Sequence, residues 1–148
     1  EAACLQVFHA ADAPSPPRNA WQRLQADPQR LAATRLRLHP ACAWLACTHA
    51  AVDLWQAHMR AESMDSADLA GIDPDQAQDA LLWRDDDGLV QVAALPPGCA
   101  AALDALQGGA ALLPVLSRLP GDAAATLLAH LAGDGVVSDI LVPTVEAT

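Results

Sequence analysis

Residues 79–95, with the sequence DALLWRDDDGLVQVAAL, constrain the fold more than any other stretch of this 148-residue chain. Two apolar runs flank Asp86-Asp87-Gly88, and Gly88 can adopt the positive φ that a tight hairpin turn requires. The sequence therefore predicts a β-hairpin with strands near 80–84 and 89–95.

A further strand is predicted near 35–47. Leu36 and Leu38 alternate with Arg35 and Arg37, which is the period of a half-buried strand. The following residues, ACAWLACTH, fit a strand or a helix, and we favour a strand.

Helical patterns surround these strands, so the predicted fold class is α+β, mainly helical with a small antiparallel sheet. Residues 19–33 predict one short helix or two pieces, because Pro28 interrupts the pattern. Residues 50–62 predict a helix with Val52, Trp55 and Met59 on one apolar face. Three further helices are predicted between residues 96 and 133, with Pro-Pro before the first and Gly108-Gly109 after it.

The boundary between two regions is predicted at residue 34. Residues 1–34 are expected to be the remnant of an N-terminal helical region and a linker, which contains the proline-rich DAPSPP. Residues 35–148 are expected to form the α+β domain.

The core is expected to depend on a few large side chains. Hydrophobic residues make up 53% of the chain, but much of this is alanine, which buries little area. Trp44, Leu54 and Trp55 are therefore predicted to be mostly buried.

The charge balance argues against nucleic-acid binding. The net charge is −10, and all eight basic residues are arginine, so the surface repels phosphate backbones. No apolar run reaches the roughly 18 residues of a membrane helix, and no signal peptide is recognisable. We expect a cytoplasmic protein with reduced thiols and no membrane partner.

The cluster of histidines and cysteines in residues 38–58 allows a metal site or a packed core. His39, Cys42, Cys47 and His49 are bunched and interrupted by Trp44, whereas structural zinc sites prefer two separated knuckles. Core packing is favoured, and no metal ligand is predicted in this chain.

Catalytic motifs give little support for an enzyme. Cys99 is predicted near a helix start, where a thiolate is favoured, but no histidine lies nearby in the sequence. No catalytic residue is predicted. A small zinc or thiol enzyme, and a DNA-binding regulator built on the three C-terminal helices, remain the alternatives.

The order of motifs from Leu36 onward resembles bacterial accessory C proteins of methanobactin biosynthesis, a family that has been labelled a DNA-binding domain. His39-Pro40 opens the block and Leu54-Trp55 lies in the next helix. The hairpin then leads through Pro-Pro-Gly into an LxALxxGxxL helix that spans residues 103–112.

The resemblance implies a non-catalytic accessory subunit, with residues 35–148 as a peptide- and partner-binding domain. Such proteins form a heterodimer with a TIM-barrel oxidase that carries the iron, and they bind a precursor peptide through its leader. With dioxygen, the pair converts peptide cysteines to oxazolone and thioamide groups that later bind copper. No cofactor is expected in this chain itself.

The residues expected to contact the peptide lie on the hairpin, and those expected to contact the partner subunit lie close to His39. A leader peptide can add to an open strand of the hairpin through main-chain hydrogen bonds. We therefore predict peptide contacts along one of its two strands and partner contacts beside His39. The predicted peptide-binding residues are Leu81, Leu82, Trp83, Arg84, Leu89, Val90, Gln91 and Val92, and the predicted partner interface is Arg35, Arg37 and His39.

Overall fold

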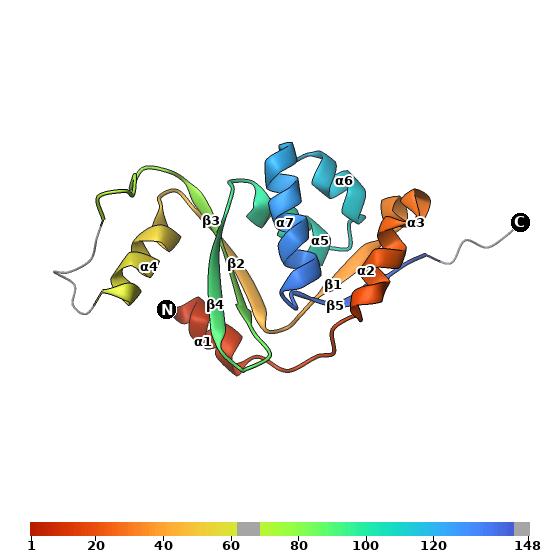
Figure 1. The fold of residues 1–148 in the computed structure, drawn as a ribbon, viewed down its shortest axis with the longest axis horizontal. Coiled ribbons are helices and arrows are strands. Elements are labelled where there is room, and N and C mark those ends of the chain that lie inside the picture. Colours follow the sequence, from red (N-terminus) through yellow and green to blue (C-terminus); the bar gives the residue numbers. More distant parts are fainter. Residues whose placement is uncertain (62–68, 144–148) are drawn as a thin grey trace, which may run out of the picture.

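The computed structural model describes residues 1–61 and 69–143 of the chain. Within these ranges the chain has an α+β fold, as predicted, with seven helices and two small antiparallel sheets (Figure 1). The single strand predicted near 35–47 is divided at residues 39–41, and its two parts belong to different sheets. The helices are α1 (Ala2–His9), α2 (Arg18–Gln25), α3 (Pro28–Ala33), α4 (Ala51–Arg60), α5 (Cys99–Gln107), α6 (Leu112–Ser117) and α7 (Gly121–Gly133). The strands are β1 (Arg35–Leu38), β2 (Cys42–Cys47), β3 (Gln78–Arg84), β4 (Val90–Leu95) and β5 (Val137–Leu141).

The predicted hairpin is formed by β3 and β4. Gly88 has a φ of 80°, and the Asp85 carboxylate accepts backbone N–H bonds from Asp87 at 3.0 Å and Leu89 at 2.9 Å. The Gln91 side chain also donates to Asp85. The bonds from Gln91 and then Leu89 hold the pKa of Asp85 below its usual value. The turn is thus fixed by its own side chains, and it sets the register of the two strands.

β3 is the central strand of a three-stranded sheet in the order β2-β3-β4. The strand favoured for the residues after Pro40 is confirmed as β2. Residues that pair across two neighbouring strands project to the same face of the sheet, and successive residues along one strand alternate between the two faces. One row on the inner face is Trp44, Leu81 and Ala93, and one row on the outer face is Ala43, Leu82 and Val92.

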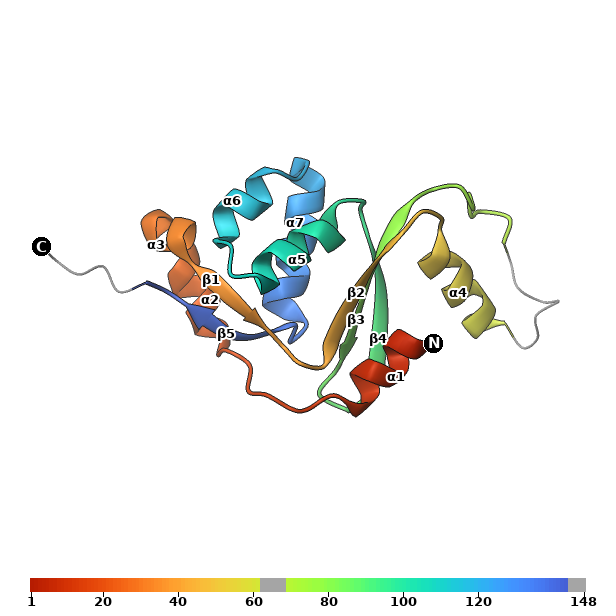
Figure 2. The same ribbon diagram turned by 180° about the vertical axis from the view of Figure 1, so that it is seen from behind.

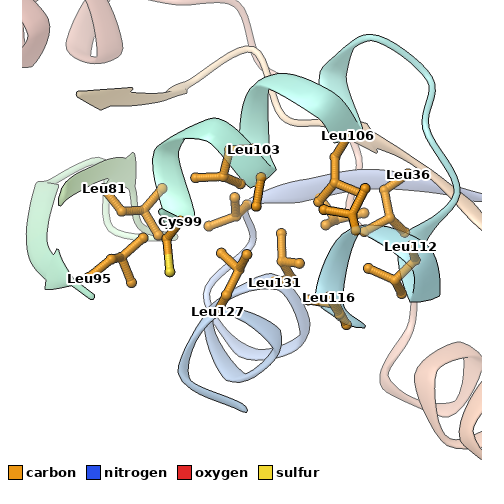
Figure 3. Close-up of a cluster of buried hydrophobic side chains, with 14 of the residues drawn as sticks. Leu36, Leu81, Leu95, Cys99, Leu103, Leu106, Leu112, Leu116, Leu127 and Leu131 are labelled. Carbon is orange, nitrogen blue, oxygen red and sulfur yellow. The ribbon is translucent and has the colours of Figure 1, made fainter. Parts of the chain in front are cut away.

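The inner face of this sheet carries the main hydrophobic core (Figure 3). Leu103 and Leu106 of α5 and Leu127 and Leu131 of α7 are fully buried, together with Leu81 of β3. Burying a leucine side chain contributes about 1.5–3 kcal/mol. This layer of leucines therefore holds the C-terminal helices on the sheet.

The outer face is covered by α1 and α4. Val7 of α1 and Val52 of α4 are buried with Ala80 and Leu82 of β3 in a second, smaller cluster. The sheet is therefore the middle layer between the C-terminal helices and two short helices on its other side.

Pro28 divides residues 18–33 into α2 and α3, one of the two predicted outcomes. The Asp27 carboxylate caps α3 by accepting the Arg30 N–H at 3.2 Å. Trp21 and Leu24 of α2 are buried in the main core. Residues 18–33 thus pack against the α+β region that follows them.

β5 was not predicted as a strand. It pairs antiparallel with β1, with Arg37 opposite Asp139, and Ser138 donates a side-chain hydrogen bond to the carbonyl of Arg37, 101 residues earlier. None of the helices in the two described ranges is long and apolar enough to cross a bilayer.

The predicted apolar face of α4 is only partly correct. Val52 is buried, but Trp55 is 36% exposed and Met59 is 66% exposed, and Leu54 is partly buried. α4 lies at one end of the molecule, with the sheet on one side of it (Figure 1), so its contacts bury little beyond Val52. The prediction that Trp55 is mostly buried is therefore wrong.

Candidate peptide-binding edge and the neighbouring groove

The predicted peptide-binding residues lie on two strands with different surroundings. β3 pairs with β2 on one side and β4 on the other, so the main-chain groups of Leu81, Leu82, Trp83 and Arg84 face paired strands. This excludes β3 as the open edge. Of the two predicted strands, only β4, with Val90, Gln91 and Val92, lies at a sheet edge within the described residues.

Main-chain groups alternate along β4 between the side of β3 and the open side. The N–H of Asp85 donates to the carbonyl of Leu89 at 2.8 Å, across the hairpin. Every second residue from Leu89 onward therefore bonds toward β3. The groups of Val90, Val92 and Ala94 point to the open side, where an added strand would bond.

One side chain already occupies part of this edge. The Gln56 side-chain nitrogen, from α4, donates to the carbonyl of Val92 at 2.9 Å. In the part of the chain that the structure describes, this is the only hydrogen bond that reaches the open-side groups of Val90, Val92 and Ala94. Gln56 mimics one bond of an absent strand, and a peptide would have to displace it.

The side chains of the predicted β4 contacts differ in exposure. Leu89, just before β4, is 61% exposed. Val90 and Val92 are partly buried on the outer face, next to the cluster that contains Val7. Gln91 is exposed, but its amide is bonded to Asp85 at 2.8 Å. An added strand would thus find apolar contacts at Leu89, Val90 and Val92.

The side chains of Leu81, Leu82 and Trp83, which were predicted to contact the peptide, pack within the protein. Leu81 and Leu82 are buried on opposite faces of the sheet. Trp83 packs against the ring of His130, with centroids 5.5 Å apart.

Arg84 holds the C-terminal end of α1. Its Nη1 donates to the carbonyls of Val7 at 3.2 Å, Phe8 at 2.8 Å and Ala10 at 2.8 Å. Its Nη2 lies 2.7 Å from the Asp12 carboxylate. Helices end in unsatisfied carbonyls, and a cation is favoured there. Arg84 therefore anchors α1 to the sheet, a role that no local sequence signal indicates.

The three predicted partner-interface residues, Arg35, Arg37 and His39, line one groove. Its volume is about 520 Å³, and it is also lined by Gln6, Gln107, Gly109 and Leu141. The two strands that border it, β1 and β2, diverge from a shared turn (Figure 2). Trp44 lies in its wall; the sequence predicted that this residue is mostly buried, and it is partly so. The indole N–H of Trp44 donates to Asp104 of α5 at 2.7 Å, which fixes this wall of the groove.

His39 organises the turn between β1 and β2. Its Nδ1 accepts the backbone N–H of Ala41 at 2.9 Å, and its Nε2 lies 3.0 Å from the carbonyl of Ala13. Nε2 also lies 3.3 Å from the backbone nitrogen of Ala13. His39 thus joins the N-terminal linker to the turn, and both ring nitrogens are engaged within the chain.

The buried thiols are held in the protonated form. Burial raises the pKa of Cys42 to about 12. Burial, with a smaller contribution from the Asp79 carboxylate, raises the pKa of Cys99 to about 11. The expectation that the helix start favours a Cys99 thiolate is therefore wrong, because burial and the Asp79 charge outweigh the helix.

Asp79 was not recognised from the sequence. This buried carboxylate of β3 accepts the backbone N–H of Gly98 at 3.1 Å and of Ala100 at 2.7 Å. It therefore caps α5 from a distant strand. The pattern of the α5 residues gave no sign of it, because the cap lies 19 residues before Gly98.

The histidines and cysteines of residues 38–58 do not converge. Cys42 and Cys47 lie at opposite ends of β2, about 17 Å apart for five residue steps in a strand. His49 lies 4.0 Å from Asp75. Within residues 1–61 and 69–143, no three His, Cys, Asp or Glu side chains come together as a metal-binding group.

The chain matches no protein-family model, no curated protein and no solved structure. The resemblance to methanobactin accessory proteins therefore depends on the order of the motifs quoted above.

Proposed function

We propose that this chain is a non-catalytic accessory subunit that captures an extended precursor peptide on the open edge of β4. The peptide is then presented to an iron-dependent oxidase subunit, which modifies its cysteines in the synthesis of a methanobactin-type copper chelator. The observation that carries the proposal is the set of open-side main-chain groups at Val90, Val92 and Ala94.

Strand addition suits these groups physically. An added antiparallel strand bonds to every second residue of its neighbour, and these bonds provide affinity without requiring one sequence. The apolar side chains of Leu89, Val90 and Val92 supply contacts that select among peptides. The net charge of −10 favours a leader with basic residues.

The oxidase subunit is the expected source of the metal chemistry. Iron would be held by that subunit, and this chain would bind it through the surface around Arg35, Arg37 and His39. The pKa values of Cys42 and Cys99 support an accessory role, because neither thiol is poised to act as a nucleophile.

Proline substitution on the open edge tests peptide capture. Val92→Pro removes an N–H that points away from β3, so it removes a bond to an added strand and leaves the β3–β4 ladder intact. Val92→Ala is the matched control, because it shortens the same side chain and keeps the N–H. Binding of a synthetic leader-type precursor peptide with basic and apolar residues is measured by calorimetry, and circular dichroism checks folding.

We expect Val92→Pro to weaken peptide binding at least tenfold more than Val92→Ala does. Gln56→Ala removes the competitor for the Val92 carbonyl and should tighten binding, by up to about 1.5 kcal/mol for one hydrogen bond. Unchanged affinity in a folded Val92→Pro protein would show that the peptide does not bind at β4. Co-purification with the TIM-barrel subunit tests the rest of the proposal.

A further inference from the structure

We infer that the groove between β1 and β2 binds an extended acidic segment of the partner protein, with carboxylates at alternate positions facing Arg35 and Arg37. This inference deepens the proposed function and depends on it for the identity of the partner. The proposed segment is an extended polypeptide strand in which acidic and apolar residues alternate.

The charged side chains of the groove are positive, whereas the protein as a whole has a negative net charge. The chain carries 18 acidic residues, yet within the part of the chain that the structure describes no Asp or Glu lines this cavity, whereas Arg35 and Arg37 do. Among residues 1–61 and 69–143, Arg35 has no carboxylate within 4.0 Å. Arg37 has only Asp139, at 4.0 Å, and both of these side chains are more than half exposed. The arginines are therefore available to an external anion.

The other ionisable side chains in the groove are engaged within the chain or buried. Both ring nitrogens of His39 contact backbone groups of Ala13 and Ala41, and burial, which raises the pKa of Cys42 to about 12, keeps its thiol protonated. Among the described residues, no acidic side chain in the groove offsets the positive charge. The two guanidinium groups thus decide which charge the groove accepts.

Main-chain groups that have no partner strand among the described residues border the same groove on β1. The N–H of His39 donates to Val136 at 2.7 Å, on the side of β5, and the carbonyl of Thr34 accepts the Leu112 N–H at 2.7 Å, on the other side. By alternation, the groups of Leu36 and Leu38 point away from β5. They form an edge that can accept an extended strand.

In the described part of the chain, β2 has an open edge on the same groove. The N–H of Arg84 donates to the carbonyl of Ala41 at 3.1 Å, so every second residue from Ala41 bonds toward β3. The main-chain groups of Cys42 and Trp44 point away from β3, and both residues line the groove. A segment in the groove can therefore bond to either edge.

The spacing of the arginines sets the pattern of the segment. Arg35 and Arg37 are two residues apart on β1, which separates them by about 7 Å along the strand. Carboxylates at alternate positions of a paired strand have the same spacing and project to the same face. The apolar residues between them would face Leu36, Leu38 and Trp44.

Two hexapeptides test the inference by NMR titration of the whole chain. The acidic probe is Thr-Glu-Val-Glu-Val-Thr, and the neutral probe replaces both Glu with Gln. Opposite-charge pairs across strands contribute about 0.2–1 kcal/mol each, so the acidic probe should bind about 2- to 30-fold more tightly. Amide shifts should appear at residues 35–44, and added salt should reduce the difference.

Arginine variants identify the groups responsible. Arg35→Gln and Arg37→Gln should each weaken binding of the acidic probe about 1.4- to 5-fold and leave the neutral probe unchanged. Arg118→Gln is the matched control, because Arg118 is exposed on another surface, after α6. Equal binding of the two probes, or unchanged binding in both groove variants, would overturn the inference.

Two small anions separate a strand site from a simple anion pocket. Glutarate and inorganic phosphate are added as competitors at the concentration of the acidic probe. Failure of both anions to displace the probe supports an extended segment, and displacement by either one overturns it. Since capture at β4 is tested with the precursor peptide and Val92→Pro, failure at the groove is distinguishable from failure of the proposed function.

Discussion

Replacing Arg84 should release α1 from the sheet and leave the rest of the fold intact. Arg84→Met keeps most of the apolar stem and removes the donors to the carbonyls of Val7, Phe8 and Ala10. α1 has only eight residues, and isolated helices shorter than about 12 residues are marginal in water. What remains to hold α1 is mainly the buried side chain of Val7.

The magnitude follows from the contacts of the guanidinium. A hydrogen bond from a charged donor contributes about 1.5–3 kcal/mol. A single nitrogen cannot make three full bonds to the three carbonyls, so we expect a loss of about 2–4 kcal/mol from this group. The ion pair with Asp12 adds at most about 1 kcal/mol, because the Asp12 side chain is 94% exposed.

Hydrogen exchange followed by NMR measures this loss locally. Because 1.4 kcal/mol corresponds to a factor of ten, a loss of 2 kcal/mol accelerates exchange at residues 5–10 about 30-fold. Amides of β3 and β4 should keep their rates. Arg84→Lys should have an intermediate effect, since an ammonium cannot span the carbonyls as a guanidinium does, and Asp12→Asn should change little. Unchanged exchange in α1 of Arg84→Met would refute the anchoring role.

Three further predictions concern stability. In the folded state the pKa values of Cys42 and Cys99 are raised, whereas in the unfolded state both thiols have the ordinary pKa of 9.0. Above pH 9 the unfolded state therefore loses these protons while the folded state keeps them. The contribution of the two thiols to stability is complete below pH 9 and is lost at about 1.4 kcal/mol per pH unit for each thiol as the pH rises toward 11–12. Urea unfolding from pH 8 to 10.5 checks this in a chain without Lys or Tyr, and a flat profile would contradict it. Trp55→Ala should cost less than about 1.5 kcal/mol, whereas Trp21→Ala, at a buried site, should cost about 3–5 kcal/mol; thermal melts that reverse this order would refute the burial assignments. Asp79→Ala should cost about 1–3 kcal/mol, because it leaves two N–H groups of α5 without their cap; a melting temperature equal to that of the unmodified chain would count against the cap.

Local chemistry explains why the hairpin was predictable from the sequence. The turn depends on Gly88 and on the Asp85 carboxylate, both of which lie within the turn itself. Pro28 likewise divides α2 from α3 through its own missing N–H. Such elements are specified by neighbouring residues, so a sequence pattern reveals them.

The properties that decide the candidate site depend on contacts distant in the sequence. Whether β3 or β4 is the open strand depends on β2, which pairs with β3 although α4 lies between these two strands in the sequence. The strand character of β5 depends on β1, about a hundred residues earlier. Arg84 reads as a strand residue, but it contacts carbonyls of α1 more than 70 residues away. No periodicity encodes these relations.

The composition of the edge strands links the fold to the proposed function. Natural sheets protect their edges with charged side chains, proline or a covering element, because unpaired main-chain groups recruit other strands. β2 (CAWLAC) and β4 (VQVAAL) contain no charged residue and no proline. On β4, the described residues supply one covering bond, from Gln56. In the proposed function a peptide displaces this single bond, while the net charge of −10 opposes self-association. These features are what a protein requires to keep a sheet edge open for a peptide and remain dispersed without one.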